Sequence, residues 1–188
     1  MYNKKYPVVA QTEHAYHEHE QYRINLTFCN VTRGEYMPLM AYVTYIWALR
    51  TDGQLVLGVE KLHKHPQLIK AMGLYKQIVP KSHKLGHPTL AYDGVDYCDI
   101  SIAGELYWLM DGRWCMNNDS GRYGVLKRFT TAEVYHLMNT AKKVFHKAIG
   151  LNPVIQLMHR GRDSHAKSLR KIQRQAASEW RISPAPIT

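Results

Sequence analysis

The chain has 188 residues, of which 45% are hydrophobic and 11% aromatic, and its formal net charge is +10. This length and apolar content suit one globular domain, residues 1–188, and exclude a disordered chain. The excess of Lys and Arg favours an anionic partner, nucleic acid first and an acidic protein second, whereas a basic surface that serves only solubility is the alternative.

Residues 1–22 form a polar N-terminal segment without the apolar stretch of a secretory leader. His14, His17 and His19 fit no familiar metal spacing, and their acidic neighbours indicate a solvated surface, so we expect no metal.

No run reaches the ~20 apolar residues that span a bilayer, so no membrane partner is expected. Three cysteines without a paired framework suit a reducing compartment. We therefore expect action in the cytoplasm, although delivery by a specialised secretion system or cleavage from a larger precursor would leave the same sequence.

The first half of the chain predicts strands. Residues Arg23–Cys29 alternate in polarity, and Met40–Leu49 is rich in β-branched and aromatic residues. Asp52-Gly53 is typical of a tight turn, and Gln54–Val59 then returns as the partner strand of a β-hairpin. A short helix is expected over Pro66–Met72.

A second hairpin is predicted further along the chain. Residues Cys98–Leu109 form a strand, Asp111-Gly112 a turn, and Arg113–Asn117 the returning strand. The run Asn118–Gly121 that follows combines Asn, Asp, Ser and Gly, so it predicts a loop.

The best-defined helix begins after Thr130. Thr130 and Glu133 have the spacing of a capping box, and apolar residues recur on one face up to Ile149. Gly150 suits the position that ends the helix. We expect this helix to pack on the sheet.

A basic tail covers residues 159–188, and Ser164–Trp180 within it is a candidate helix. Its cations could bind phosphates of nucleic acid, although a solvated helix with scattered charges is the alternative. The cations concerned are Arg160, Arg162, Lys167, Arg170, Lys171 and Arg174. The predicted fold is thus α+β: an antiparallel or split β-sheet, a capped helix packed on it, and a basic C-terminal helix.

Three reactive side chains lie between Gly86 and Gly124. His87 could bind a ribose hydroxyl or transfer a proton, and Glu105 is a carboxylate inside an apolar strand, where it needs a partner. Tyr123 could stack on a base or a nicotinamide ring, or it could be a core aromatic. We predict that these three are catalytic.

The loop beside them predicts binding of a phosphate or ribose. Backbone N–H groups near Asn118, Ser120 and Gly121 could cradle an anion, and Arg122 could clamp a phosphate. Thr89, close to His87, is included among the residues predicted to bind the cofactor.

Four short motifs carry a resemblance to a known module. They are Ala48–Gly53, His87–Leu90, Ala103–Glu105 and Asn118–Tyr123. In this order they resemble the C-terminal domains of bacterial polymorphic toxins and effectors, and the core of plant IQ-motif calmodulin-binding proteins, over residues 40–150. The resemblance implies a toxin or effector, and a toxin of this kind can have a cognate inhibitor or immunity protein. Pro88 and Arg122 depart from the module, which has Ser and His there, so a proton-transfer role of that His is lost here. No calmodulin-binding motif is evident.

Two enzyme hypotheses and one binding hypothesis fit these residues. In an ADP-ribosyltransferase, NAD would be the substrate, His87 would hold a ribose, Tyr123 would pack on nicotinamide and Glu105 would stabilise the oxocarbenium-like transition state. The order of the residues differs from known ADP-ribosyltransferases, which place the Glu last. In a metal-independent ribonuclease, His87 and Glu105 would be the acid–base pair and Arg122 would bind the scissile phosphate. A non-catalytic nucleic-acid-binding protein, which uses the tail and the loop only for phosphate contacts, is the third hypothesis.

Overall fold

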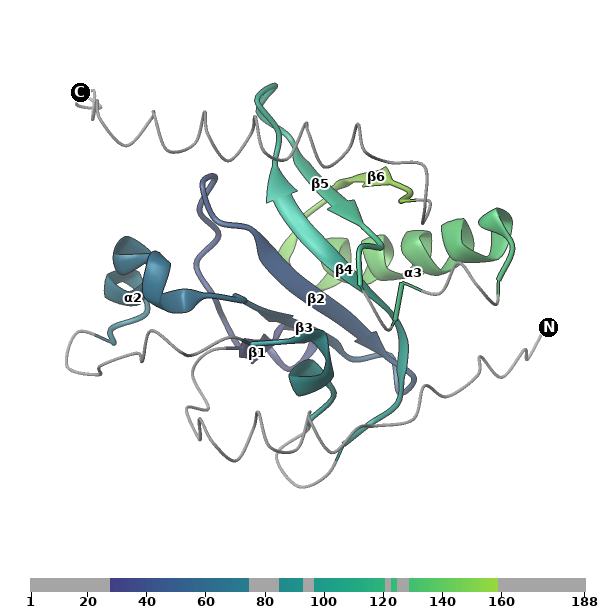
Figure 1. Ribbon diagram of the computed structural model, residues 1–188, viewed down its shortest axis with the longest axis horizontal. Helices are drawn as coiled ribbons and strands as arrows, with labels where there is room; N and C mark the ends of the chain where they lie inside the picture. The colour runs from purple at the N-terminus through teal and green to yellow at the C-terminus, as the bar shows by residue number, and fades with distance from the viewer. Residues whose placement is uncertain (1–27, 75–84, 93–96, 121–122, 125–128, 159–188) are drawn as a thin grey trace.

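The computed structural model describes residues 28–74, 85–92, 97–120, 123–124 and 129–158, and six strands in these ranges form one sheet (Figure 1). In sequence order the strands are β1 Phe28–Asn30, β2 Tyr45–Arg50, β3 Leu55–Gly58, β4 Ile100–Trp108, β5 Trp114–Asn117 and β6 Val154–Gln156. Their order across the sheet is β1-β3-β2-β4-β5-β6. The α+β fold is therefore confirmed.

The sheet is mixed rather than antiparallel or split. All neighbouring pairs from β1 to β5 are antiparallel, and β6 runs parallel to β5. Parallel neighbours need a crossover, and the helix α3, Thr131–Ile149, provides it between these two strands. The three-residue strand β6 had no distinct sequence signal, so the parallel pair was not predicted.

Both predicted hairpins are confirmed. β2 and β3 are joined at Gly53, and β4 and β5 at Gly112, with φ of 84° and 86° that favour glycine. The strand predicted from Met40 is wrong in its first part, because Val43 donates a backbone hydrogen bond to Met40 in a turn. The strand begins at Tyr45, whose hydroxyl accepts the N–H of Met40 at 2.8 Å.

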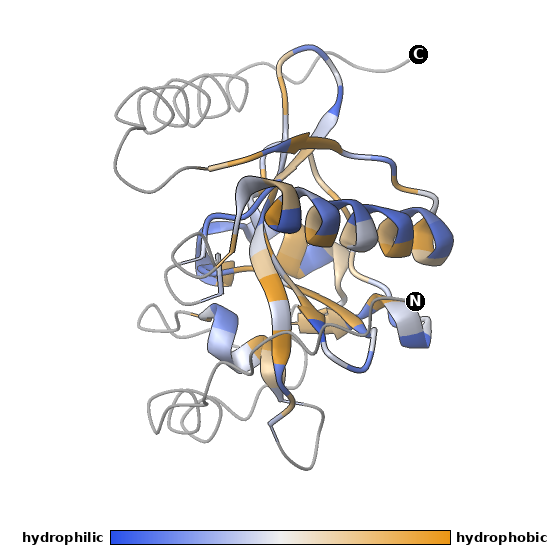
Figure 2. Ribbon diagram, turned by 90° about the vertical axis from the view of Figure 1, so that its right-hand side faces the viewer, coloured by the Kyte–Doolittle hydropathy of each residue, from blue (hydrophilic) through white to orange (hydrophobic). Residues whose placement is uncertain are grey.

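Helix α3 covers one face of the sheet, and hydrophobic and hydrophilic positions alternate along it (Figure 2). The capping box is confirmed, since Thr130 and Glu133 bind each other's backbone N–H. The helix ends at Ile149, and Gly150 follows it with a left-handed φ of 70°, in the terminating position that the sequence predicted. Its buried residues join those of β2, β3, β4 and β5 in a large first cluster that includes Trp47, Leu57, Ile102, Leu106, Met116 and Phe145.

The opposite face of the sheet carries a smaller second cluster. It joins Ile46, Ala48 and Val56 of the sheet to Leu90 of the 3-10 helix η3, His87–Ala91, and to Tyr123. The remaining short helices are η1 Val31–Arg33, η2 Leu62–Lys64 and α2 Pro66–Ala71. Helix α2 agrees with the prediction over Pro66–Met72.

Several predicted segments lie outside the described residues. They include residues 1–22 with the histidine cluster, most of the strand predicted over Arg23–Cys29, and the basic tail 159–188. Among the residues that the structure describes, no helix has both the length and the apolar sequence needed to cross a bilayer.

Candidate functional site

The site is built around three successive residues in the middle of β4. The N–H of Ala103 donates to the carbonyl oxygen of Tyr123 at 3.4 Å, and the N–H of Glu105 donates to Asn117 Oδ1 at 2.9 Å. Between them, the carbonyl oxygen of Gly104 lies 2.9 Å from His87 Nε2. The segments that carry the three predicted catalytic residues thus meet at one place on the sheet.

Gly104 allows this convergence because the chain passes directly over its Cα. A Cβ at this position would lie 1.7 Å from the carbonyl oxygen of Asn117 and 2.9 Å from the Cα of Asn118. Gly124 makes a second close approach, since a Cβ there would lie 2.4 Å from the carbonyl oxygen of Asn118. Two glycines therefore fix the path of the loop that the sequence predicted to be functional.

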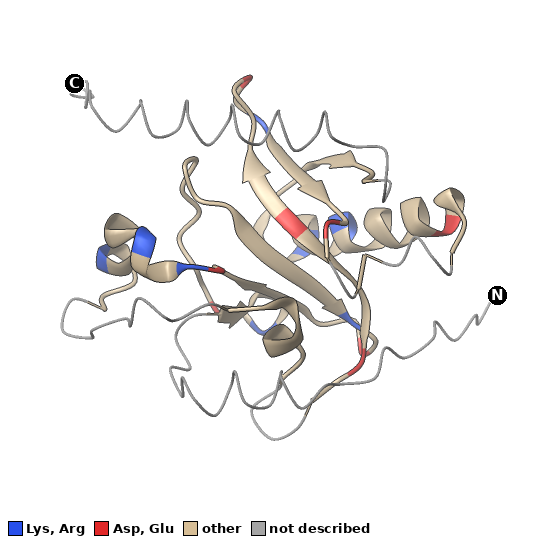
Figure 3. Ribbon diagram, viewed as in Figure 1, with Lys and Arg blue, Asp and Glu red and all other residues tan. Residues whose placement is uncertain are grey.

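The carboxylate of Glu105 is oriented by a buried amide. Asn117 Nδ2 donates to Glu105 Oε2 at 3.3 Å, and Asn117 Oδ1 also accepts the N–H of Asp119 at 2.9 Å. Asn117 is fully buried, whereas Glu105 is half-buried and is the one charged residue within β4 (Figure 3). The sequence interpretation missed the role of Asn117; an amide at the end of an apolar strand was the available signal.

His87 begins η3, and its imidazole favours the neutral form. Burial lowers the pKa of His87, while the bond to Gly104 and the charges of Asp119 and Glu60 oppose this shift. A carbonyl oxygen only accepts hydrogen bonds, so Nε2 carries the hydrogen and Nδ1 of the neutral ring is an acceptor. His87 can therefore accept a proton or bind a hydroxyl group through Nδ1.

A buried arginine that the sequence interpretation did not single out holds η3 in place. Arg50 Nε and Nη2 donate to the carbonyl oxygen of Leu90 at 3.1 and 2.9 Å, and Nη2 also donates to the carbonyl oxygen of Tyr92. Nη1 donates to Gln54 Oε1 at 3.3 Å. These bonds tie the C-terminal end of η3 to β2, and so determine where His87 lies. A charged residue directly after an apolar run, at the end of the strand, was the available signal.

Among the residues predicted to bind a cofactor, Asn118 and Ser120 make hydrogen bonds that hold the loop and its neighbours together. Asn118 binds the backbone of Met158 at 2.7 and 3.4 Å and the carbonyl oxygen of Gly124 at 3.0 Å. Ser120 Oγ accepts the N–H of Tyr123 at 3.2 Å, and Thr89 is buried in η3. Contact of these residues with a nucleotide stays a prediction. Gly121 and Arg122 lie outside the described residues.

Tyr123 is buried, with 1% of its surface exposed, in the second cluster. This placement agrees with a core aromatic, which was one of the two interpretations of the sequence. Stacking of Tyr123 on a base or a nicotinamide stays a prediction.

Polar side chains continue from Glu105 along the same side of β4, β5 and β6. The hydroxyl of Tyr107 donates to Gln156 Oε1, and Cys115 Sγ lies 3.4 Å from that hydroxyl oxygen. Burial raises the pKa of the Cys115 thiol. We call this set the polar face; it comprises Glu105, Tyr107, Cys115, Asn117 and Gln156.

The described part of the chain is close to neutral. It holds nine Lys or Arg residues and eight Asp or Glu residues, so almost all of the net charge of +10 belongs to the other residues. The six cations predicted to bind nucleic acid are among those other residues. Within the described ranges, no three His, Cys, Asp or Glu side chains come together in a way that could hold a metal ion.

The resemblance of residues 40–150 to toxin and calmodulin-binding modules was based on motifs, and it stays a prediction. The geometry of the site is therefore the main support for any function. When the chain is compared with protein-family models, curated proteins and solved structures, no match is found.

Proposed function

We propose that this chain is a toxin or effector-type enzyme that transfers the ADP-ribosyl group of NAD to a nucleic-acid or protein acceptor. The observation that carries the proposal is the carboxylate of Glu105, held by Asn117 one residue along β4 from the carbonyl oxygen of Gly104 that His87 binds. A carboxylate fixed inside a sheet has its orientation set before the reaction, which is the condition for electrostatic stabilisation of a transition state.

The reaction would use these groups in defined roles. The bond between the anomeric carbon of the ribose and the nicotinamide nitrogen breaks, and its electron pair leaves with nicotinamide. The positive charge that develops on the ribose is stabilised by Glu105. His87 Nδ1 accepts a hydrogen bond from a ribose hydroxyl, and the acceptor group bonds to the anomeric carbon and loses its proton to solvent.

Cleavage of RNA without a metal is the second candidate, and the lowered pKa of His87 favours it. A neutral imidazole at pH 7 can accept the proton of a ribose 2′-hydroxyl, whose oxygen then attacks the adjacent phosphorus. For Glu105 to be the acid of the pair, its side chain would have to enter the reaction protonated and give that proton to the leaving 5′-oxygen. This reaction needs no NAD and uses the same two side chains.

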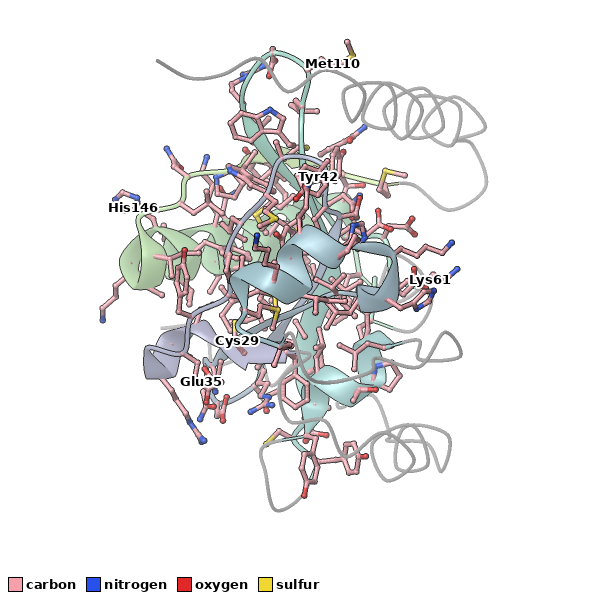
Figure 4. The ribbon with its side chains drawn as sticks, turned by 90° about the vertical axis from the view of Figure 1, so that its left-hand side faces the viewer. Cys29, Glu35, Tyr42, Lys61, Met110 and His146 are labelled. Carbon is pink, nitrogen blue, oxygen red and sulfur yellow. The ribbon has the colours of Figure 1, made fainter. Side chains whose placement is uncertain are left out.

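One set of assays separates the candidates. The purified chain is incubated with labelled NAD and cell extract, and in parallel with labelled RNA alone. The transferase predicts release of nicotinamide and a labelled acceptor, and a loss of at least about 100-fold in Glu105→Gln. Glu35→Gln is the matched control, because Glu35 is exposed and lies away from β4 (Figure 4).

Each outcome has a distinct meaning. Fragments of RNA formed without NAD, and lost in Glu105→Gln, would replace the transferase by the ribonuclease. If neither substrate is turned over while RNA is still bound, the chain is a binding protein and the enzyme proposal is wrong.

A further inference from the structure

The candidate site contains a second carboxylate, Asp119, besides the one that the proposed reaction uses. Asp119 follows the end of β5 and is half-buried. Its N–H donates to Asn117 Oδ1 at 2.9 Å, and the N–H of Glu105 donates to the same oxygen at 2.9 Å. The two backbone nitrogens therefore lie within twice that distance of each other, although they belong to different segments of the chain.

The side-chain amide of Asn117 has one orientation that satisfies this arrangement. Its oxygen is the acceptor of the amide, and both backbone N–H donors point at it. The amide nitrogen then points toward Glu105 and donates to Glu105 Oε2 at 3.3 Å. Because Asn117 is fully buried, one fixed group sets the carboxylate of Glu105 and the backbone of Asp119 together.

The backbone on the other side of Asp119 is also held by hydrogen bonds. The N–H of Ser120 donates to the carbonyl oxygen of Asn118 at 2.9 Å, and the N–H of Gly124 donates to the carbonyl oxygen of Ser120 at 3.1 Å. Asn118 Oδ1 accepts the N–H of Met158 at 2.7 Å. Asp119 thus has a backbone position that is set from both sides, as a group needs if it is to meet a substrate in one geometry.

His87, Glu105 and Asp119 are grouped around Gly104. His87 binds the carbonyl oxygen of Gly104, Glu105 is the next residue of β4, and the segment that leads to Asp119 crosses the Cα of Gly104. Burial lowers the pKa of His87, and after the bond to Gly104 the charge of Asp119 opposes this shift more strongly than that of Glu60. The carboxylate of Asp119 therefore lies close enough to the imidazole to act on it.

The proposed reaction leaves one role open. Hydrolysis of glycosidic bonds commonly uses two carboxylates, one that stabilises the positive charge on the sugar and one that exchanges a proton with the incoming or leaving group. Cleavage of NAD at its ribose likewise breaks a bond from an anomeric carbon. Glu105 has the first of these roles and His87 binds a ribose hydroxyl, so the incoming acceptor still needs a base.

We infer that Asp119 is the general base of the site and takes the proton of a neutral hydroxyl or N–H group of the acceptor. This inference rests on the proposed transferase function. The acceptor atom bonds to the anomeric carbon, and the bond to nicotinamide breaks with its electron pair on nicotinamide. The proton of the acceptor moves to the carboxylate of Asp119, which then releases it to solvent. The acceptor class is thus one that must lose a proton, and not one that is already an anion.

Two small acceptors test this role although the natural acceptor is not identified. The purified full chain is incubated with NAD and either methanol, whose hydroxyl must lose a proton, or azide, which has no proton to lose. Asp119→Asn keeps the shape of the side chain and removes the base. We expect formation of methyl ADP-ribose to fall at least about 100-fold in this variant, whereas ADP-ribosyl azide should form within about threefold of the wild-type rate.

Glu60→Gln is the matched control, because it removes the other carboxylate whose charge acts on His87. It should leave both products at the wild-type rate. A loss of methyl ADP-ribose in Glu60→Gln equal to that in Asp119→Asn would mean that the charge near His87 matters and that Asp119 is not the base.

A second measurement checks the position of Asp119 without any turnover. The ring of His87 is titrated by NMR in the wild type and in Asp119→Asn. Loss of a carboxylate beside the ring should lower the pKa of His87 further, because the carboxylate favours the charged imidazolium. An unchanged pKa would overturn the inference whatever the activity, because the carboxylate would then not face the ring.

Failure of the inference and failure of the proposed function give different results. A wild-type chain that releases no nicotinamide with either acceptor contradicts the transferase itself, and the role of Asp119 as its base is lost with it. If the wild type is active, equal losses of the methyl and azide products in Asp119→Asn would show that Asp119 only supports the loop. Methyl ADP-ribose formed at the wild-type rate in Asp119→Asn would show that another group takes the proton.

Discussion

At the scale of single residues, the geometry of the site depends on side chains that bind the backbone and on a glycine that the backbone approaches closely. Gly104 lets residues 117–118 cross β4, Asn117 replaces a strand partner for the N–H of Glu105, and Arg50 binds the end of η3. A substitution of Asn117 or Arg50 would leave buried polar groups without a hydrogen bond, and a side chain at position 104 would clash with the backbone.

Gly104→Ala tests the close approach at the centre of the site. The added methyl group would lie 1.7 Å from the carbonyl oxygen of Asn117, so the loop must shift. We expect a loss of about 3 kcal/mol in the free energy of unfolding, measured in urea. Ser101→Ala, at a half-buried position of the same strand, should change it by less than about 1 kcal/mol. Equal stability of the two variants would contradict this account of the loop.

The lowered pKa of His87 predicts a dependence of stability on pH. The ordinary pKa of 6.5 applies to the unfolded chain, and burial lowers the pKa in the fold. The neutral ring therefore contributes stability above pH 6.5, and this contribution is lost as the pH falls through 6.5 toward the lower pKa of the folded state.

His87→Gln isolates this effect. A glutamine amide can still donate to the carbonyl oxygen of Gly104, but it does not titrate. Between pH 7.5 and 5, the free energy of unfolding should fall more steeply in the wild type than in His87→Gln, when both are measured by urea unfolding. Parallel pH profiles would show that His87 has the same pKa in the folded and unfolded chains.

At the scale of elements, some helices and strands are specified by residues within their own sequence, whereas others are held in place by residues of distant strands. The β4–β5 hairpin and α3 have their turn and capping residues inside their own sequence, and both were predicted. By contrast, η3 is fixed at its two ends by Gly104 and Arg50, which belong to other strands.

Thr130→Ala tests the local signal at α3. The substitution removes the side-chain oxygen that accepts the N–H of Glu133 at 3.3 Å. We expect a loss of about 1 kcal/mol, seen as a lower midpoint in thermal unfolding. Thr131→Ala is the control, since Thr131 is exposed and is the first residue inside the helix. A similar loss in Thr131→Ala would mean that the cap is not the cause.

At the scale of the whole molecule, the excess positive charge and the candidate site belong to different parts of the chain. The described fold is nearly neutral, and the excess of cations belongs mainly to segments outside it, the basic tail above all. Helix α3 also carries cations near its C-terminal end, where the helix dipole explains them without a ligand. Binding of RNA should therefore depend on the tail and not on α3.

The salt dependence of RNA binding tests this separation. Replacing Lys167, Lys171 and Arg174 by Gln should reduce the slope of log affinity against log salt by about 2 for single-stranded RNA, because three phosphate contacts are lost. Replacing Lys142, Lys143 and Lys147 by Gln removes the same charge from α3 and should leave the slope unchanged. Equal effects of the two triple variants would assign binding to net charge alone.

The hairpins at Gly53 and Gly112 and the capped helix α3 could be predicted from the sequence, because turns and caps depend on residues that are neighbours in the chain. The sequence also identified Glu105 as a carboxylate that needs a partner. The folded chain was needed to show that Asn117 binds this carboxylate, that Arg50 holds η3, and that β6 runs parallel to β5. These features depend on which distant segments meet in space, and packing of the whole sheet determines that.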